Sequence, residues 1–262
     1  MQLHHVRRGT GPTLLLIHGL GSQGHAWDPV LDPLARERDV VVIDLPGFGA
    51  SAPLPAGVTP TPGALAGSVA AFLAGLGVER AHVAGNSLGG WVALELARLG
   101  RASSATLISP AGFWSEGDRR YASATLRASR WLARHLAGVG RHVLASAAGR
   151  TLLLSQVFAR PGRMPAEVAI AQARAFIQAP GFDATFSACA APGSGFRGGA
   201  DVTCPVTIAW GDRDRLLWPR QARRAAAALP GARLVSLRGC GHTPMWDDPP
   251  QVARLLLDGS AG

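Results

Sequence analysis

Lysine is absent from the 262 residues, so all 26 basic residues are arginine. Acidic residues are also few, with 17 Asp and Glu, which leaves a formal net charge of +9. Nucleic-acid binding would need arginines clustered with interleaved aromatic side chains. The densest arginines, between positions 119 and 150, are instead spread at helical spacing. This pattern indicates a solvated or lipid-facing helix surface and argues against a nucleic-acid partner.

Cysteine is scarce as well. The odd number and wide spacing of Cys189, Cys204 and Cys240 exclude a disulfide framework and a zinc site. The chain has no apolar run of about 18 residues that could span a membrane, and Met1–Arg8 has no apolar core of a secretory signal. We therefore expect a cytoplasmic protein with no bound metal and no stable membrane insertion.

The composition argues against a disordered chain. Hydrophobic residues make up 47% and charged residues 16% of the sequence, whereas a typical soluble domain is about 25% charged. Disorder needs low hydrophobicity and high charge. The length allows one large domain or one domain with an insertion, and either can bury a substantial core.

Six short apolar runs followed by turn-forming residues alternate with segments of helical periodicity. Such runs are typical of buried parallel strands. The predicted strands are Leu14–Ile17, Val40–Ile43, Ala81–Ala84, Ala105–Ile108, Val206–Trp210 and Arg233–Leu237, with Gln2–Val6 as an additional edge strand. The predicted helices are Trp27–Glu37, Pro62–Leu76, Gly90–Leu99, Pro219–Leu229 and Pro249–Leu257. This alternation predicts an α/β fold with a parallel sheet covered on both faces.

The segment 111–200 interrupts the alternation because it contains no convincing strand. Its helical patterns cover Arg119–Ala137, Val139–Phe158 and Pro165–Gln178. A structureless loop of that length would be implausible in a compact domain. We therefore expect residues 1–110 and 201–262 to form the α/β core, and residues 111–200 to form an inserted helical cap, or lid.

The sequence Gly85-Asn86-Ser87-Leu88-Gly89 lies between a predicted strand and a predicted helix. In this context G-x-S-x-G indicates a nucleophile elbow, a sharp turn that exposes the serine hydroxyl. Side chains at the flanking positions would collide across so tight a turn, which explains the two glycines. The following helix directs its N-terminal N–H groups and positive dipole end at the serine. Ser87 is therefore predicted to be a nucleophile.

A serine nucleophile needs a base and an acid that orients the base. His242 follows the last predicted strand in a glycine-rich loop, and Asp214 follows the strand before it. Because the carboxyl ends of parallel strands meet at one edge of a sheet, these residues and Ser87 are expected to lie together. Asp212 is the alternative acid, but a turn-forming role suits it better.

Acyl transfer also needs N–H donors for the developing oxyanion. The Leu88 N–H, at the predicted helix N-terminus, is one candidate. The Leu20 N–H, in the loop after the first core strand, is the other. His18 in the same loop is predicted to fix the loop by hydrogen bonds rather than to act as the base.

These segments together resemble the α/β-hydrolase family, in the family's order and over nearly the whole chain. The matching pieces are residues 18–21, 44–51, 85–89, 211–214 and 241–242. The resemblance implies a mostly parallel eight-stranded sheet with a helical cap after the sixth strand. It favours Asp214, the fourth residue of G-x-x-D, as the acid, and a structural role for Asp44. Family members that open epoxides or remove halide use Asp where this chain has Ser87, which disfavours those reactions.

The resulting hypothesis is a carboxylesterase-like serine hydrolase that needs no metal or cofactor. It would cleave a carboxylic ester or thioester of a small apolar or aromatic substrate through an acyl-enzyme. One alternative is a carbon–carbon bond hydrolase of aromatic catabolism, whose elbow resembles residues 85–90, although the family's usual Trp after the histidine is Thr243 here. The other is a slow-turnover ligand receptor on the same fold. The sequence is compatible with a monomer or a homodimer.

The substrate pocket is expected to be apolar, because the predicted cap has many apolar and few acidic residues. Four tryptophans are candidates for its wall. Trp114 and Trp131 belong to the predicted cap, Trp91 follows the elbow and Trp246 follows His242. For Trp91 and Trp246, packing in the core is the alternative interpretation.

Overall fold

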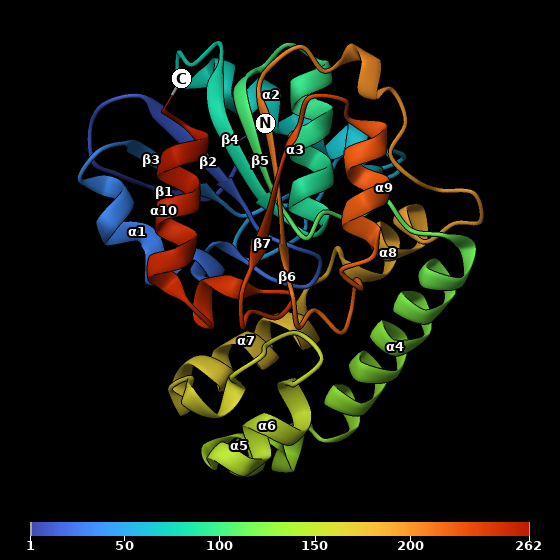
Figure 1. Ribbon diagram of the computed structural model, residues 1–262. Coiled ribbons are helices and arrows are strands. Elements are labelled where there is room, and N and C mark those ends of the chain that lie inside the picture. The colour runs from blue at the N-terminus through green and yellow to red at the C-terminus, as the bar shows by residue number, and fades with distance from the viewer. Residues whose placement is uncertain (1, 262) are drawn as a thin grey trace.

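The computed structural model describes residues 2–261, and within them the core is one seven-stranded sheet of order β1-β3-β2-β4-β5-β6-β7 (Figure 1). The strands are β1 (His5–Arg8), β2 (Thr13–Ile17), β3 (Asp39–Ile43), β4 (Ala81–Asn86), β5 (Ala102–Ile108), β6 (Val206–Gly211) and β7 (Arg233–Leu237). All neighbouring strands are parallel except β1, which is antiparallel to β3. The α/β fold class and the six predicted core strands are confirmed.

The expected count of eight strands is not met among the described residues. Residues 2–261 form seven strands, and the stretches outside these strands are helices, turns or irregular loops. The edge strand itself also begins three residues later than predicted, at His5.

Helices cover both faces of the sheet, as the alternation predicted (Figure 1). The helices on one face are α2 (Pro62–Gly75), α3 (Leu88–Arg98) and α9 (Gln221–Ala228), and those on the other are α1 (Asp28–Ala35) and α10 (Pro249–Gly259). Short 3-10 turns occur at Gly24–Trp27, Pro161–Arg163, Gly199–Asp201 and Pro244–Trp246. Every residue of β3 and β4 is buried, which explains why the strands appear as continuous apolar runs.

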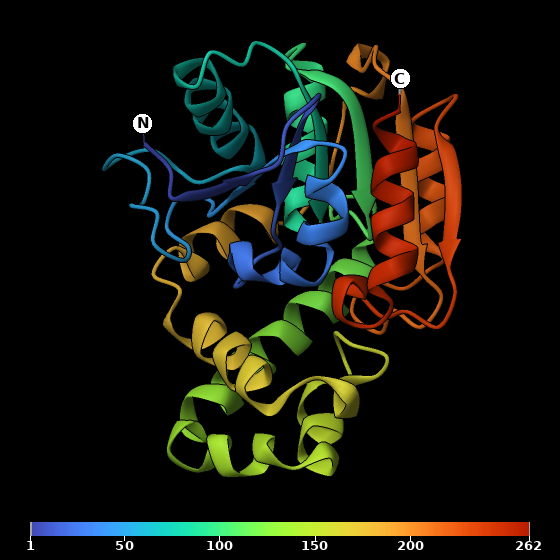
Figure 2. The same cartoon turned by 90° about the vertical axis from the view of Figure 1, so that its left-hand side faces the viewer.

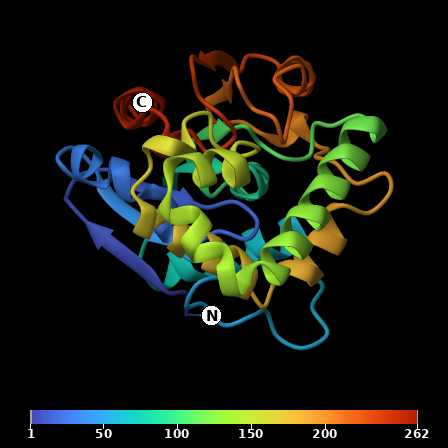
Figure 3. The ribbon, with the colours of Figure 1, turned by 90° about the horizontal axis from the view of Figure 1, so that it is seen from below.

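Between β5 and β6, where every residue is described, the chain forms five α-helices. They are α4 (Glu116–His135), α5 (Ala137–Ala145), α6 (Ala147–Leu154), α7 (Ala166–Gln178) and α8 (Phe182–Cys189). We call residues 116–189 the helical segment. Helices α4 to α7 lie beyond one end of the sheet (Figure 2), and seen from that end they lie across the core (Figure 3). No helix in the described chain has both the length and the apolarity required to cross a bilayer.

One predicted helix, Val139–Phe158, is wrong because the chain breaks into α5 and α6 at Ser146. Ser146 has an extended backbone with φ −90° and ψ 147°, and its hydroxyl accepts a hydrogen bond from the Gly149 N–H at 3.0 Å. A Cβ on Gly149 would lie 1.9 Å from the Val143 carbonyl oxygen. Glycine therefore lets the two helices approach closely, and apolar periodicity alone does not reveal such a break.

Candidate active site

Ser87 lies in the turn between β4 and α3 with φ 57° and ψ −116°, a backbone conformation that non-glycine residues rarely adopt. The turn brings backbone atoms into direct contact. A Cβ on Gly85 would lie 2.1 Å from the Gly89 carbonyl oxygen, and one on Gly89 would lie 2.2 Å from the Ile17 carbonyl oxygen. Both flanking positions therefore require glycine, as the motif predicts.

Asp214 and His242 form a buried hydrogen-bonded pair. The His242 Nδ1 and the Asp214 Oδ2 are 2.8 Å apart. The other carboxylate oxygen, Oδ1, accepts hydrogen bonds from the Leu216 and Leu217 N–H groups at 2.9 and 2.8 Å. Because a carboxylate only accepts, Nδ1 carries the proton, and Nε2 of the neutral ring keeps its lone pair. This Nε2 is buried and has no hydrogen-bond partner among the described residues.

Asp212 has a different contact. Its Oδ1 accepts a hydrogen bond from the Gly239 N–H at 2.8 Å, and the residue is exposed. It therefore holds the turn after β6 against the loop after β7. Of the two carboxylates in Gly211–Asp214, it is Asp214 that contacts His242 in the described structure.

Asn86 connects the elbow to the histidine loop, a role that our sequence analysis missed. Its Nδ2 donates to the carbonyl oxygens of Ile108 at 3.1 Å and His242 at 2.8 Å. The side chain is buried directly beside Ser87. A polar residue inside the elbow motif is a sequence signal that could have identified it, because buried amides need partners.

Asp247 connects the histidine loop to the helical segment and was also missed. Its carboxylate accepts hydrogen bonds from the Gly241 N–H at 2.8 Å, the Ala159 N–H at 2.9 Å and the Arg160 N–H at 2.8 Å. All three donors are backbone groups. Since any residue type could supply them, no sequence signal marks this contact.

The loop after β2 lies beside Ser87, and His18 fixes its shape. A Cβ on Gly19 would lie 3.2 Å from the Ser87 Cβ. The His18 Nε2 accepts from the Leu45 N–H at 2.9 Å, so Nδ1 is the nitrogen that donates to the Gly19 carbonyl oxygen at 2.8 Å. Burial lowers the pKa of His18, which favours the neutral ring that these two bonds require.

The two backbone donors predicted for the oxyanion come from different elements. Leu88 is the first residue of α3 and Leu20 belongs to the loop after β2. Both residues line the same small hollow as Ser87. The fold therefore brings both predicted donor residues close to Ser87.

Ser87 and His242 both line a cavity of about 460 Å³ between the end of the sheet and the helical segment. This volume is in the range of small-molecule sites. Its apolar side chains are mainly aliphatic and include Leu126, Leu132, Leu136, Leu144, Ile170 and Ile177. Its aromatic apolar members are Phe158 and Phe176. Polar side chains line the cavity as well, among them Arg141, Gln156 and Arg174. Leucine and isoleucine therefore supply most of the apolar part of the wall.

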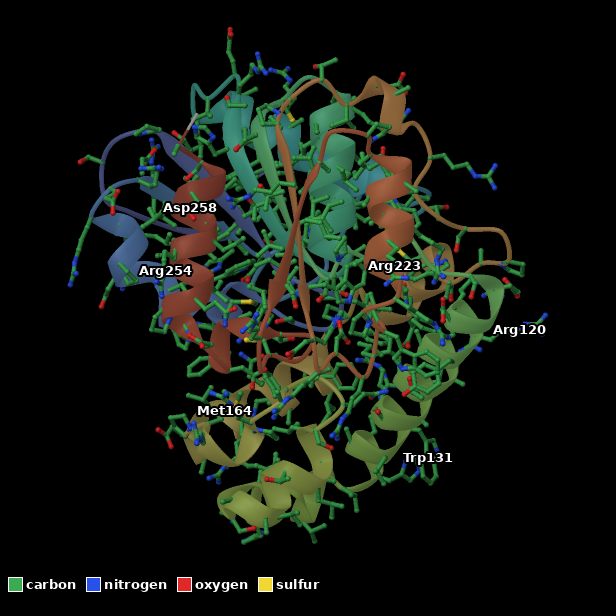
Figure 4. The ribbon with its side chains drawn as sticks, viewed as in Figure 1. Arg120, Trp131, Met164, Arg223, Arg254 and Asp258 are labelled. Carbon is green, nitrogen blue, oxygen red and sulfur yellow. The ribbon has the colours of Figure 1, made fainter. Side chains whose placement is uncertain are left out.

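Trp131 is not part of this wall, so its prediction is wrong. Trp131 is 61% exposed, and its side chain points away from the body of the molecule (Figure 4). The neighbouring Arg130 is the buried residue, because its guanidinium lies 4.0 Å from the centre of the Phe182 ring. A cation–π contact has thus reversed the burial expected from hydrophobicity alone.

The other three tryptophans do not line the large cavity either. Trp91 is buried and packs edge-to-face on Trp114 with ring centres 5.8 Å apart. Trp114 lines the small hollow beside Ser87. Trp246 packs against two clusters of buried hydrophobic residues. Packing is therefore the role that the structure shows for Trp91 and Trp246.

In the described residues, no group of three or more acidic, histidine or cysteine side chains could hold a metal ion. Asp44, which the resemblance marked as structural, binds His4 Nδ1 and the N–H groups of Gly24 and Ala50. These contacts fix two loops near the sheet.

Comparison with known proteins places this geometry in a family. The chain is 32% identical over 270 residues to the dihydrolipoyllysine-residue acetyltransferase component of the acetoin cleaving system of Cupriavidus necator, covering 98% of this chain and 66%, just under two thirds, of that relative. It is 45% identical over 91 residues to the pimeloyl-[acyl-carrier protein] methyl ester esterase of Aeromonas hydrophila subsp. hydrophila, covering 35% of this chain and 34% of that relative. A solved structure of a bacterial membrane phospholipase A is similar with a TM-score of 0.76 and 30% identity, covering 100% of this chain and 86% of the other. The model of the alpha/beta hydrolase family matches residues 14–255, and the chain belongs to this family.

Proposed function

We propose that this protein is a serine hydrolase that cleaves carboxylic esters or thioesters through an acyl-enzyme. The observation that carries the proposal is the buried Asp214–His242 pair, because His242 lines the same cavity as Ser87 and its Nε2 has no hydrogen-bond partner among the described residues. The names of two similar proteins, a methyl ester esterase and a phospholipase, support ester substrates.

In the first half-reaction the Ser87 Oγ attacks the carbonyl carbon while the His242 Nε2 takes the hydroxyl proton. Asp214 holds the ring and stabilises its protonated form. The tetrahedral oxyanion accepts hydrogen bonds from the Leu88 and Leu20 N–H groups. His242 then gives its proton to the departing alkoxide or thiolate, which leaves the acyl group on Ser87.

In the second half-reaction His242 removes a proton from water, and the resulting hydroxide attacks the acyl-enzyme. As the bond between the acyl carbon and the Ser87 Oγ breaks, His242 gives its proton to the Ser87 Oγ, so the carboxylic acid leaves and the serine hydroxyl is restored. Nε2 makes no hydrogen bond to Ser87 in this structure. This agrees with the general behaviour of catalytic hydrogen bonds, which are often long before substrate binds and shorten in the complex.

The helical segment supports the choice of an apolar acyl group. Aliphatic side chains of α4, α5 and α7 form the cavity wall opposite Ser87, and their burial against an acyl chain would favour binding. In this proposal residues 111–200 are the cap that encloses the acyl chain, and residues 1–110 and 201–262 carry the reacting groups.

The test compares wild type, Ser87→Ala and Ser22→Ala on p-nitrophenyl esters from acetate to laurate. Ser22 is the matched control because it lines the same cavity. We expect Ser87→Ala to lose at least about 10⁴-fold in kcat, since removal of a nucleophile disables the triad. Ser22→Ala should remain active. A fluorophosphonate probe should add its mass to wild type and not to Ser87→Ala.

A folded wild type that hydrolyses none of the esters and takes up no probe would overturn the proposal. Vinylogous diketones would then test carbon–carbon bond cleavage, the second reaction class. Ligand binding without turnover would instead indicate a receptor.

A further inference from the structure

The helical segment carries a strong excess of positive charge. Residues 119–166 contain nine arginines and no Asp or Glu, and six of these arginines are not buried. The whole segment 116–189 contains ten arginines and four acidic residues. Two of these acids lie in the first turn of α4, where Glu116 is paired with two arginines of α4 and Asp118 with two arginines from outside the segment. The far part of the segment is therefore basic.

The same part exposes large apolar side chains. Trp131, Leu132, Val139 and Leu152 are 61%, 41%, 55% and 77% exposed, and we call these four residues the apolar tip. Three of them lie at the junction of α4 and α5, and Leu152 lies on α6, which packs on α5. Figures 1 and 2 show this junction at the end of the molecule farthest from the two termini. Such a cluster is unusual for a surface exposed only to water.

The apolar tip adjoins the opening of the cavity. Leu132, Arg141 and Arg174 all line the cavity and are all exposed, so they mark where it meets solvent. Within residues 2–261, neither Arg141 nor Arg174 has an ion-pair partner, whereas Arg134 is paired with Asp183 at 3.3 Å. Unpaired cations and exposed apolar side chains therefore surround one opening.

We propose that the apolar tip docks this protein onto the surface of an anionic lipid bilayer. Tryptophan and aliphatic side chains enter the boundary between headgroups and acyl chains, while arginines attract anionic headgroups. A second copy of the chain fits this surface less well, because two equally basic surfaces repel. Docking in this orientation turns the cavity opening toward the bilayer, without any helix crossing it.

The binding test uses sedimentation with vesicles of phosphatidylcholine alone or with about 30 mol% phosphatidylglycerol, because anionic lipids attract arginines near the bilayer surface. Wild type should bind the anionic vesicles at low salt, bind the neutral ones weakly, and be released as salt rises. Trp131→Ser with Val139→Ser should weaken binding at least about fivefold. Leu99→Ser is the matched control, since Leu99 is 55% exposed at the opposite end of α3 from Ser87 and should leave binding unchanged.

Activity on a water-soluble ester separates docking from folding and catalysis. Trp131 and Val139 do not line the cavity, so their double variant should keep that activity. Ser87→Ala should bind vesicles like wild type, which makes this proposal independent of the catalytic one. Failure of wild type to bind anionic vesicles, or equal binding by the double variant, would overturn it. A concentration-dependent dimer lost in the double variant, without vesicle binding, would assign the tip to self-association instead.

Discussion

At the scale of single residues, two aspartates two positions apart have different contacts. Asp214 is buried with His242 and two N–H groups, whereas Asp212 is exposed and holds a turn. The two side chains point in different directions because the chain turns sharply after β6. The resemblance to the α/β-hydrolase family, in which the fourth residue of G-x-x-D is the usual acid, predicted which of them reaches the histidine.

Asp214→Asn should lower kcat about 10⁴-fold, because an amide favours the wrong tautomer of His242. Asp212→Asn is the matched control and should change kcat little. Steady-state kinetics on the preferred p-nitrophenyl ester measures both. Equal losses in the two variants would show that the turn, rather than the Asp214–His242 contact, supports activity.

Buried histidines should make stability depend on pH. Burial lowers the pKa of His18 and of His82 in the native state, whereas an unfolded histidine titrates near about 6.5. Below that pH the unfolded state binds more protons than the native state, so stability falls as pH falls. Thermal unfolding by circular dichroism should therefore give a lower Tm at pH 5.5 than at pH 7.5.

Replacing one ring tests this origin of the pH dependence. His18→Gln should lower Tm at pH 7.5, because two loop hydrogen bonds are altered, and should reduce the pH-dependent part of Tm. His142→Gln, at an exposed position, should retain the wild-type dependence. A wild-type Tm that does not change across this interval would contradict the prediction.

At the scale of elements, the site depends on how loops from different strands are held together. Asn86 joins the elbow to the histidine loop, and Asp247 joins that loop to the residues after α6. Each contact ends on backbone atoms. The packing of α3 and β4 then fixes where Ser87 points. The relative positions of Ser87 and His242 therefore depend on contacts between residues far apart in the sequence.

Asp247→Ala should lower the free energy of unfolding by about 2–4 kcal/mol, because three N–H groups lose a charged acceptor. Asp248→Ala is the matched neighbour. It removes the helix N-cap contact to the Gln251 N–H at 3.0 Å, worth about 1 kcal/mol, and a hydrogen bond from the Gln251 Nε2 at 3.2 Å. Urea denaturation measures both. Similar losses would show that Asp247 contributes no more than an ordinary cap.

At the scale of the whole molecule, the cavity exists because the helical segment, residues 116–189, lies over one end of the sheet, and the strands of that sheet come from other parts of the chain. The length of the cavity should set the length of the preferred acyl chain. Ala173 on α7 lines the cavity, whereas the nearby Ala171 is exposed and does not. The two positions allow a matched test of the same added volume inside and outside the cavity.

Ala173→Phe should lower kcat/KM for p-nitrophenyl decanoate at least about tenfold and leave that for the acetate nearly unchanged, since each excluded methylene costs about 0.8 kcal/mol. Ala171→Phe should leave both unchanged. Kinetics across the ester series measures the shift. An unchanged chain-length optimum in Ala173→Phe would show that acyl chains bind elsewhere.

Sequence patterns were enough to predict the α/β fold class, the core strands and the elbow, because these features depend on local apolar runs and sharp turns. Gly85 and Gly89 are required by contacts within the turn or with the adjacent strand. The topology of a parallel sheet places the residues that follow its strands at one edge of the sheet. For that reason Ser87, Asp214 and His242 could be predicted to form one site.

Which side chains of the helical segment face inward depends on contacts between distant parts of the chain. Arg130 is buried on Phe182 while Trp131 is exposed, and the chain breaks at Ser146 where periodicity predicted one helix. Burial of a side chain depends on which distant element packs against it, and Asp247 binds backbone groups that every residue type possesses. Neither kind of contact leaves a local pattern in the sequence.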